Sequence, residues 1–262
     1  MNDARAGLFV DTHAHLDDPV FDEDRDGVLL RAEQAGVRRI VNVGYNPERW
    51  ASTIQLATSY PAVAVVLGLH PQEARLFETR LLDDLTAAVV RSGACALGEI
   101  GFDFYRDGPD RAAQRTAFRA QLELAAELSL PVVIHQRAAE EDLIDALRSA
   151  PDLPGVLLHS FDGSARLARF AAERGYAVGI GGLATRPSAS ALRDVLASLP
   201  LASLVLETDS PYLVPTGARH GRNEPANVAL VAERLAPLWG VSAEELAAAT
   251  SERAKLFFGL NG

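Results

Sequence analysis

The sequence predicts an α/β protein, a (β/α)8 TIM barrel with an additional C-terminal helix. Short apolar segments alternate with segments of helical periodicity along one continuous stretch of chain. Several of these short segments are uninterrupted runs of apolar and β-branched residues, which is typical of parallel strands covered on both faces. The 262-residue chain contains no linker rich in Gly, Ser or Pro, so we expect one domain over residues 1–262.

The apolar runs give eight expected strands, at Leu8–Asp11, Arg39–Val43, Val63–Leu67, Ala94–Leu97, Val132–Ile134, Val156–Leu158, Tyr176–Ile180 and Leu204–Glu207. The expected helices lie at Asp24–Ala35, Pro47–Ser59, Leu82–Ser92, Asp110–Leu128, Glu140–Ala150, Ser164–Arg174, Ser188–Ser198, Asn227–Leu238 and Ser242–Phe257. The clearest is Asp110–Leu128, where apolar residues recur at intervals of three and four. The last helix begins with Ser242 and Glu245, spaced as in a capping box.

Composition limits the classes of function. The formal net charge of −10 disfavours loose, sequence-independent attachment to nucleic acid, although it permits a locally basic or metal-lined cleft. The single cysteine, Cys95, fits a reducing compartment, and no signal peptide or stretch of about 18 apolar residues is visible. We therefore expect a cytoplasmic protein that has no membrane span and no obligate protein partner.

Histidines and carboxylates gather at the ends of the predicted strands. Five of the six histidines and two acidic residues come there: His13, His15, His70, Glu99, His135, His159 and Asp209. In this barrel the carboxyl ends of all strands meet at one face. One histidine at a strand end is more often a core or rim residue, but the repetition around the barrel favours one shared site. A divalent cation binds both imidazole nitrogen and carboxylate oxygen, which relieves the cost of crowding these groups.

The number of candidate ligands favours two metal ions. Six side chains are available: His13, His15, Glu99, His135, His159 and Asp209. A single tetrahedral zinc site needs only three protein ligands and a water, whereas two neighbouring ions would use all six. Because Lys255, the only lysine, lies in the expected C-terminal helix, a carboxylated lysine cannot bridge the ions, and Glu99 is the natural bridge.

The motifs, in their order along the chain, closely resemble the TatD family of metal-dependent deoxyribonucleases. They are DTHAHLDD, GLHP, GEIGFDFYRD, LSLPVVIH, HSFDGS, LETDSPYLVP, RNEP and TSERAKLFF. The resemblance spans Val10 to Leu260 and implies a TIM barrel that hydrolyses phosphodiester bonds with divalent metal, including 3′-to-5′ exonuclease activity. Matched position by position, it implies that His13 and His15 bind the first metal and that His135 and His159 bind the second. It also implies that Glu99 bridges the two and that Asp209 binds metal and handles the proton of the attacking water.

Three positions depart from the family pattern. Gln72 follows Pro71 where the family has His, and HQRAA at His135–Ala139 replaces the usual HxRDA. Arg253 stands where the family usually has Asn. His135 itself is retained, so none of these departures removes one of the six expected ligands.

The first hypothesis is a metal-dependent deoxyribonuclease that acts on DNA ends, single-stranded ends above all. Its cofactors are two divalent ions, and Zn, Mn, Mg, Co and Ni all remain open. We expect Asp209 to be the catalytic residue, orienting a water activated at the site and accepting its proton. The residues expected to bind substrate are His70, Arg106, Arg137 and Arg222 for phosphate oxygens, and Tyr105 for a terminal base.

Two alternatives stay open. Water-activating metals also hydrolyse carboxyl-type bonds, so an amide, lactone or aminoacyl ester is a second substrate class, which the acidic net charge mildly favours. The third hypothesis is a barrel that binds metal or a partner without catalysis. Activity on single-stranded DNA ends, compared with activity on a panel of small esters and amides, separates the first two, and absence of hydrolysis by metal-replete protein on every substrate class would favour the third.

Overall fold

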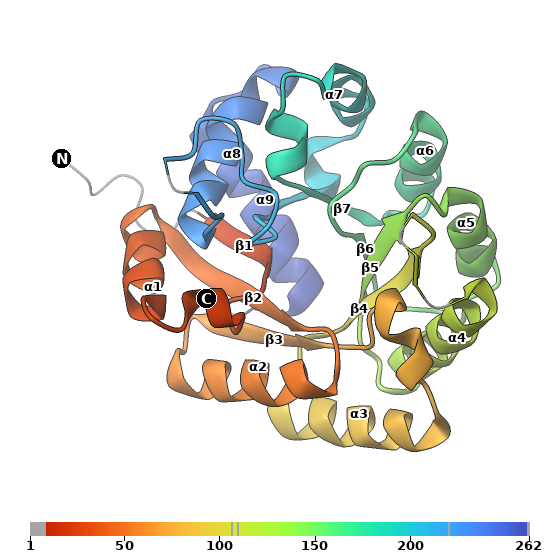
Figure 1. The fold of residues 1–262 in the computed structure, drawn as a ribbon. Coiled ribbons are helices and arrows are strands. Elements are labelled where there is room, and N and C mark those ends of the chain that lie inside the picture. The colour runs from red at the N-terminus through yellow and green to blue at the C-terminus, as the bar shows by residue number, and fades with distance from the viewer. Residues whose placement is uncertain (1–8, 106, 109, 220, 261–262) are drawn as a thin grey trace.

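The structure, a computed structural model, describes residues 9–105, 107–108, 110–219 and 221–260, and within them it confirms the predicted barrel (Figure 1). All neighbouring strands pair in parallel, in the order in which they follow along the chain. The strands are β1 (Phe9–Ala14), β2 (Val37–Gly44), β3 (Val63–Leu67), β4 (Ala96–Asp103), β5 (Val132–Arg137), β6 (Val156–Leu158), β7 (Ala177–Ile180) and β8 (Leu204–Leu206).

Helices alternate with these strands and surround the barrel (Figure 1). They are α1 (Arg25–Gln34), α2 (Pro47–Ser59), α3 (Thr79–Ser92), α4 (Arg111–Glu127), α5 (Glu140–Arg148), α6 (Ala165–Glu173), α7 (Ser190–Ala197), α8 (Val228–Leu235) and α9 (Ala243–Phe258). Short 3-10 helices include η1 (Pro19–Phe21), η2 (Pro71–Leu76) and η6 (Ala236–Trp239), the last of which continues α8. Within the described ranges no helix is both long and apolar enough to cross a membrane.

The predicted capping box at the start of α9 is present. The Ser242 hydroxyl accepts a hydrogen bond from the Glu245 amide, and the Glu245 carboxylate accepts one from the Ser242 amide. These bonds satisfy two backbone donors that the first turn of a helix leaves free. Ser242 and Glu245, which the sequence predicts as a capping box, therefore fix where the additional C-terminal helix begins.

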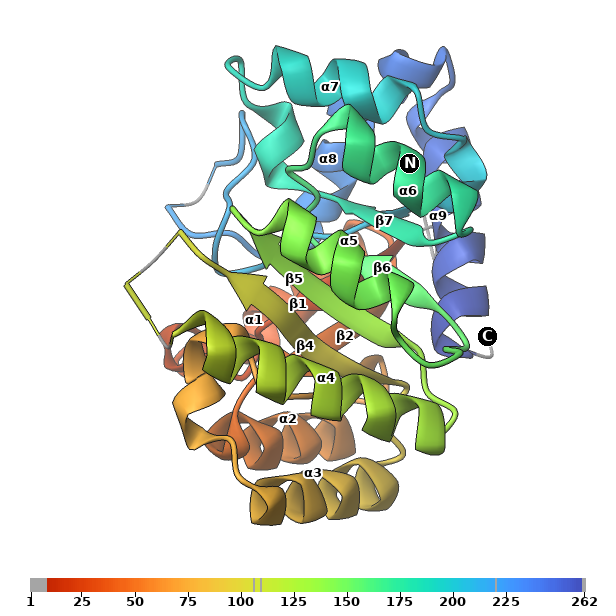
Figure 2. The ribbon, with the colours of Figure 1, turned by 90° about the vertical axis from the view of Figure 1, so that its right-hand side faces the viewer.

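The barrel interior is filled by small apolar side chains contributed by every strand. They are Val10, Val41, Val43, Val66, Ala96, Val133, Leu157, Ala177 and Val205, and they pack with Ala254 and Phe258 of α9. In Figure 2, α9 lies at the end of the barrel opposite the arrowheads of β4 and β5. α9 therefore covers the amino-terminal end of the barrel interior.

The barrel closes between β1 and the segment that follows β8. Ala14 and Ser210 form a parallel bridge. The Asp209 amide donates to the His13 carbonyl at 2.8 Å, and the His15 amide donates to the Ser210 carbonyl at 2.8 Å. We call this pairing of residues 13–15 with residues 209–210 the seam; it places two predicted site segments side by side.

Four strands continue further than the sequence predicts: β2 by one residue, to Gly44, and three others by three residues or more. β1, β4 and β5 run past the expected ends, so His13, Glu99 and His135 lie within strands rather than after them. The reason is that the parallel ladder between β4 and β5 continues through Asp103 and Arg137 although the apolar run has ended. A strand in this barrel remains paired where its side chains become polar at the open end. Leu8 of the first expected strand lies outside the described residues.

Candidate metal centre

The six expected ligands meet at the carboxyl-terminal end of the barrel, with Glu99 at the centre. Glu99 Oε1 lies 2.6 Å from His135 Nδ1 and 3.6 Å from His159 Nε2. Glu99 Oε2 lies 3.4 Å from His13 Nε2. The two oxygens of one carboxylate therefore face different histidines, an arrangement that suits a bridging ligand.

Asp209, which belongs to the segment of the seam that follows β8, completes the cluster. Its Oδ1 lies 3.5 Å from His15 Nε2 and 4.0 Å from His159 Nε2. The Asp209 side chain is 15 % exposed and that of Glu99 is 6 % exposed. Of the two expected carboxylate ligands, Asp209 is therefore the more open to the mouth, which is our name for the carboxyl-terminal end of the barrel. The backbone of Asp209 is left-handed, with φ of 56°. Such a conformation is unfavourable for a residue other than glycine, and it is maintained here by the hydrogen bonds of the seam.

Neighbouring acceptors orient two of the imidazole rings. His15 Nδ1 lies 3.0 Å from the Val43 carbonyl, which only accepts, so Nδ1 carries a proton and Nε2 is left facing Asp209. His159 Nδ1 lies 3.1 Å from Glu207 Oε2, which leaves Nε2 facing the cluster. Carboxylates and carbonyls in this position commonly orient histidines that bind metal.

Burial and mutual contact shift the ionisation of the cluster strongly. Burial alone would lower the pKa of His159, but the Glu207 and Glu99 carboxylates raise it to about 10. Burial is also outweighed at His135, where Glu99 and Asp103 raise the pKa to about 9. Although burial opposes ionisation of Glu99, the surrounding histidines hold its pKa well below its usual range. Without bound metal, protonated imidazoles therefore supply the positive charge that stabilises the central carboxylate.

The donor set fits a divalent metal. His13 is fully buried, and neither of its ring nitrogens has a hydrogen-bond partner among the described residues. A buried polar group without a partner is costly, and a metal ion would satisfy it. Three combinations place their ligand atoms within 4.8 Å of one another: His13 with His15 and Asp209, His70 with Glu99 and His135, and His13 with His159 and Glu207. The first and second of these combinations have no residue in common, which is consistent with two ions.

The expected substrate-binding residues have different surroundings. His70 lies in the cluster, with Nε2 3.8 Å from Glu99 Oε1, and burial lowers its pKa to about 3. The Arg137 guanidinium lies over the Tyr105 ring, with Cζ 4.0 Å from the ring centroid. Arg222 is engaged elsewhere, because it pairs with Asp24. Arg106, the remaining member of the set, lies outside the described residues.

The bonds of Arg222 hold it close to the loop after β1. Its guanidinium donates to the Val20 carbonyl at 2.6 Å and lies over the Phe21 ring, 4.6 Å from the centroid. These contacts, together with Asp24, use the groups with which a guanidinium would grip a phosphate. Arg222 thus connects the RNEP segment to η1.

Two further groups at the centre are not among the expected ligands. Asp103 is buried, and its Oδ2 lies 3.5 Å from His135 Nε2. Side chains two and four residues apart on a strand point to the same side, so the position of Glu99 four residues earlier was a usable signal. Asp11 accepts bonds from the Thr208 hydroxyl at 2.6 Å and the Thr208 amide at 2.9 Å, which joins β1 to the residue before Asp209.

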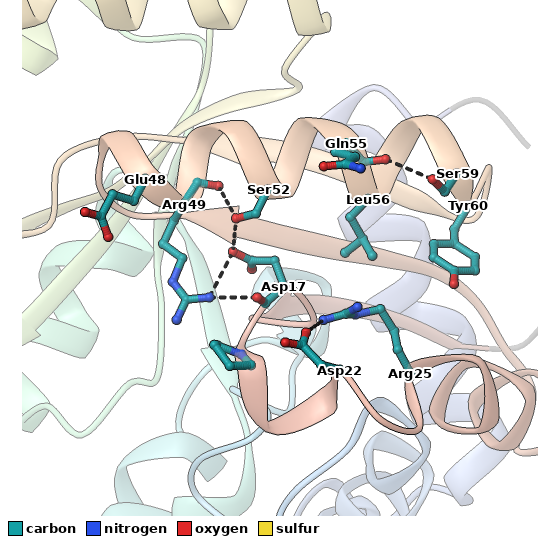
Figure 3. Close-up of a pocket in the computed structure, with 11 residues that line it drawn as sticks. Asp17, Asp22, Arg25, Glu48, Arg49, Ser52, Gln55, Leu56, Ser59 and Tyr60 are labelled. Atoms are coloured by element: carbon teal, nitrogen blue, oxygen red, sulfur yellow. Dashed lines mark hydrogen bonds and ion pairs between the residues drawn. The ribbon is translucent and has the colours of Figure 1, made fainter.

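A separate cavity of about 570 Å³ lies on the flank of the barrel, between η1 and α2 (Figure 3). The carboxylate of Asp17 contacts Arg49 and the Ser52 hydroxyl there, and Asp22 pairs with Arg25. Both arginines of this cavity are therefore paired with acidic residues. None of the six expected ligands lines it.

Comparison with known proteins agrees with this geometry. Residues 10–259 match the family described as TatD-related DNase. An uncharacterized metal-dependent hydrolase of Bacillus subtilis, YabD, is 34 % identical over 97 % of this chain and 100 % of its own length. The 3′-5′ ssDNA/RNA exonuclease TatD of Salmonella typhimurium is 34 % identical over 95 % of this chain and 98 % of its own. The crystal structure of YjjV, a TatD homologue from Escherichia coli, superimposes with a TM-score of 0.91 at 37 % identity, covering 97 % of this chain and 99 % of that one.

Proposed function

Because the chain belongs to the TatD-related DNase family, we propose that it is a divalent-metal-dependent nuclease that removes nucleotides from the 3′ end of single-stranded DNA. The observation that carries this proposal is the convergence of four histidines and two carboxylates at the carboxyl-terminal end of the barrel. The exonuclease activity named for the Salmonella relative supports the choice of substrate.

We assign the two metal positions from the contacts. One ion would be held by His13, His15 and Asp209, and the other by His135 and His159, with Glu99 between them. This assignment is supported by the two oxygens of Glu99, one of which contacts His13 and the other His135. When bound, divalent ions would acidify a water molecule and polarise the phosphate.

The chain's own residues would then position the reactants. Asp209, the ligand that is open to the mouth, would accept a hydrogen bond from the attacking water and take its proton. His70 would be uncharged at neutral pH, because burial disfavours its protonated form, so it would contribute a hydrogen bond to a phosphate oxygen through one ring N–H. The Arg137 guanidinium beside Tyr105 would supply positive charge near the phosphate.

The test is digestion of end-labelled oligonucleotides, single- and double-stranded, with Mn²⁺, Zn²⁺, Mg²⁺, Co²⁺ or Ni²⁺ added in turn. We expect metal-dependent shortening of the single strand from its 3′ end, and no shortening by the Glu99→Ala variant. Hydrolysis of small esters or amides without cleavage of DNA would contradict the proposal and favour the carboxyl-type activity. Absence of hydrolysis of every substrate class by metal-loaded protein would favour a binding role.

A further inference from the structure

We infer that Tyr45 and Tyr212 form a base-stacking subsite beside His15, in which Tyr212 lies across the mouth from Tyr105 and Arg137. This inference rests on the proposed nuclease function and specifies how the substrate is recognised. In this arrangement, unpaired bases on the two sides of the metal centre would lie on separate aromatic surfaces. The enzyme would therefore select unpaired ends by stacking.

Both tyrosines contact the same imidazole. The Tyr45 ring centroid lies 5.4 Å from that of His15 at an interplanar angle of 87°, and the Tyr212 centroid lies 5.9 Å away at 63°. Tyr45 directly follows β2, and the Tyr212 amide donates to the Asp209 carbonyl at 2.8 Å. The two rings thus border the part of the centre formed by β1 and the seam.

The subsite is ordered before a ligand arrives. The Tyr45 ring also packs edge-on against His70, with centroids 6.1 Å apart, and Arg49 Cζ lies 5.8 Å from its centroid. Arg49 is in turn fixed by a 2.7 Å bond to the Asp17 carbonyl. An aromatic surface that is already immobilised loses little conformational entropy when a base stacks on it. Tyr212, which is 49 % exposed, leaves ring surface available to solvent and to a ligand.

The second aromatic surface lies across the mouth. Tyr105 is 68 % exposed and follows β4, whereas Tyr212 follows β8. In a ring of eight strands these two positions face each other, with the metal centre between them. A strand whose phosphate occupies the centre would carry one neighbouring base toward each tyrosine. Bases that are paired and stacked in a duplex cannot separate in this way without melting.

Charge gives an independent reason to expect stacking. The net charge of −10 opposes general attraction of a polyanion, and Arg49, which lies beside Tyr45, and Arg222 are already paired with acidic residues. Beyond the metal centre and Arg137, binding of a nucleic acid end would then draw on contacts other than phosphate attraction. Aromatic rings supply such contacts to any base, because every base has a π face.

The experiment compares two single-stranded oligodeoxynucleotides, one intact and one whose last two 3′ nucleotides are abasic. The proteins are wild type, Tyr212→Ala, Tyr212→Leu and Tyr212→Phe, each metal-loaded and with folding checked by thermal melting. Tyr60→Leu is the matched control, since Tyr60 is an aromatic residue of the flank cavity (Figure 3), away from the metal centre. The readout is the ratio of kcat/KM for the intact substrate to that for the abasic one.

We expect wild type to prefer the intact oligonucleotide about 5- to 100-fold, as stacking energies of this kind predict. Tyr212→Ala and Tyr212→Leu should reduce this preference mainly through KM, Tyr212→Phe should keep most of it, and Tyr60→Leu should not change it. An unchanged preference in Tyr212→Ala overturns the inference. So does an equal loss on both substrates, or a loss in Tyr212→Phe as large as in Tyr212→Ala. If wild type cleaves neither oligonucleotide, the nuclease proposal itself fails, which is a different result from cleavage with an unchanged ratio.

Discussion

Substitution of Gly179 by alanine should disturb the candidate metal centre without touching any expected ligand. Gly179 lies in β7, and a Cβ atom added there would fall 2.3 Å from Glu207 Oε2 and 2.9 Å from Glu207 Cδ. The carboxylate of Glu207 cannot move away without loss, because its Oε1 accepts the Ser160 amide at 2.6 Å and its Oε2 lies 3.1 Å from His159 Nδ1. Glu207 is also 1 % exposed, so it is shielded from bulk solvent.

The magnitude follows from these contacts. To reach an ordinary van der Waals distance, the carboxylate has to move by about 1 Å. This shift breaks or lengthens the hydrogen bond from the Ser160 amide to the Glu207 carboxylate. It also takes that carboxylate away from the buried imidazole of His159. We expect the free energy of unfolding to fall by about 2–4 kcal/mol. Because His159 loses the group that orients it, metal affinity or turnover should fall about 10- to 100-fold.

The assay combines urea denaturation, metal content after dialysis against Mn²⁺, and phosphodiester hydrolysis. Gly221→Ala is the matched control, since a Cβ there meets nothing within 4 Å, and we expect its effects to be small. In a Glu207→Ala background the added methyl has no carboxylate to meet, so Gly179→Ala should then cost little further stability. The reasoning is refuted if Gly179→Ala retains wild-type stability and metal content, or if its cost is the same with and without Glu207.

Three other predictions follow from the site and its surroundings. Asp209→Asn should retain part of the metal, measured by elemental analysis, but lose turnover, because the amide cannot accept the proton of the water. Thr208→Val should lower the free energy of unfolding in urea by about 1–3 kcal/mol, because it removes the 2.6 Å hydrogen bond to the buried Asp11; an unchanged midpoint would contradict this. The hydrogen bond from Arg222 lowers the pKa of Asp24 from 3.8, so the resulting stability is present above that value and lost as pH falls through the folded pKa. Asp24→Asn should therefore be less stable than wild type by at most about 1 kcal/mol at pH 7, and the difference should vanish in acid.

The convergence of the six expected ligands could be predicted from the sequence because it depends only on topology. Once the chain is known to form eight parallel strands in order, the carboxyl ends meet, and residues such as His13 and His159 must lie together whatever their detailed contacts. Strand ends were harder to predict, since β4 continues through polar residues that an apolar pattern does not include. Asp103 was missed for this reason.

The partners of charged surface residues could not be predicted. A guanidinium such as that of Arg222 carries the same sequence signal whether it faces a phosphate or an aspartate, and here it pairs with Asp24, which lies almost 200 residues earlier in the chain. The exposed ring of Tyr212 likewise has no periodicity to mark it, because it lies in a loop. Such contacts depend on how loops pack at the rim, which a pattern of strands and helices leaves open.

The seam explains how distant parts of the chain act as one site. Its backbone bonds run from the Asp209 amide to His13 and from the His15 amide to Ser210, so the first strand and the candidate catalytic carboxylate share one hydrogen-bonded unit. The same unit keeps Asp209 in a left-handed conformation that an isolated loop would leave. Closure of the barrel and orientation of Asp209 therefore depend on the same hydrogen bonds. A change that opens the seam should disturb the metal centre before it unfolds the barrel.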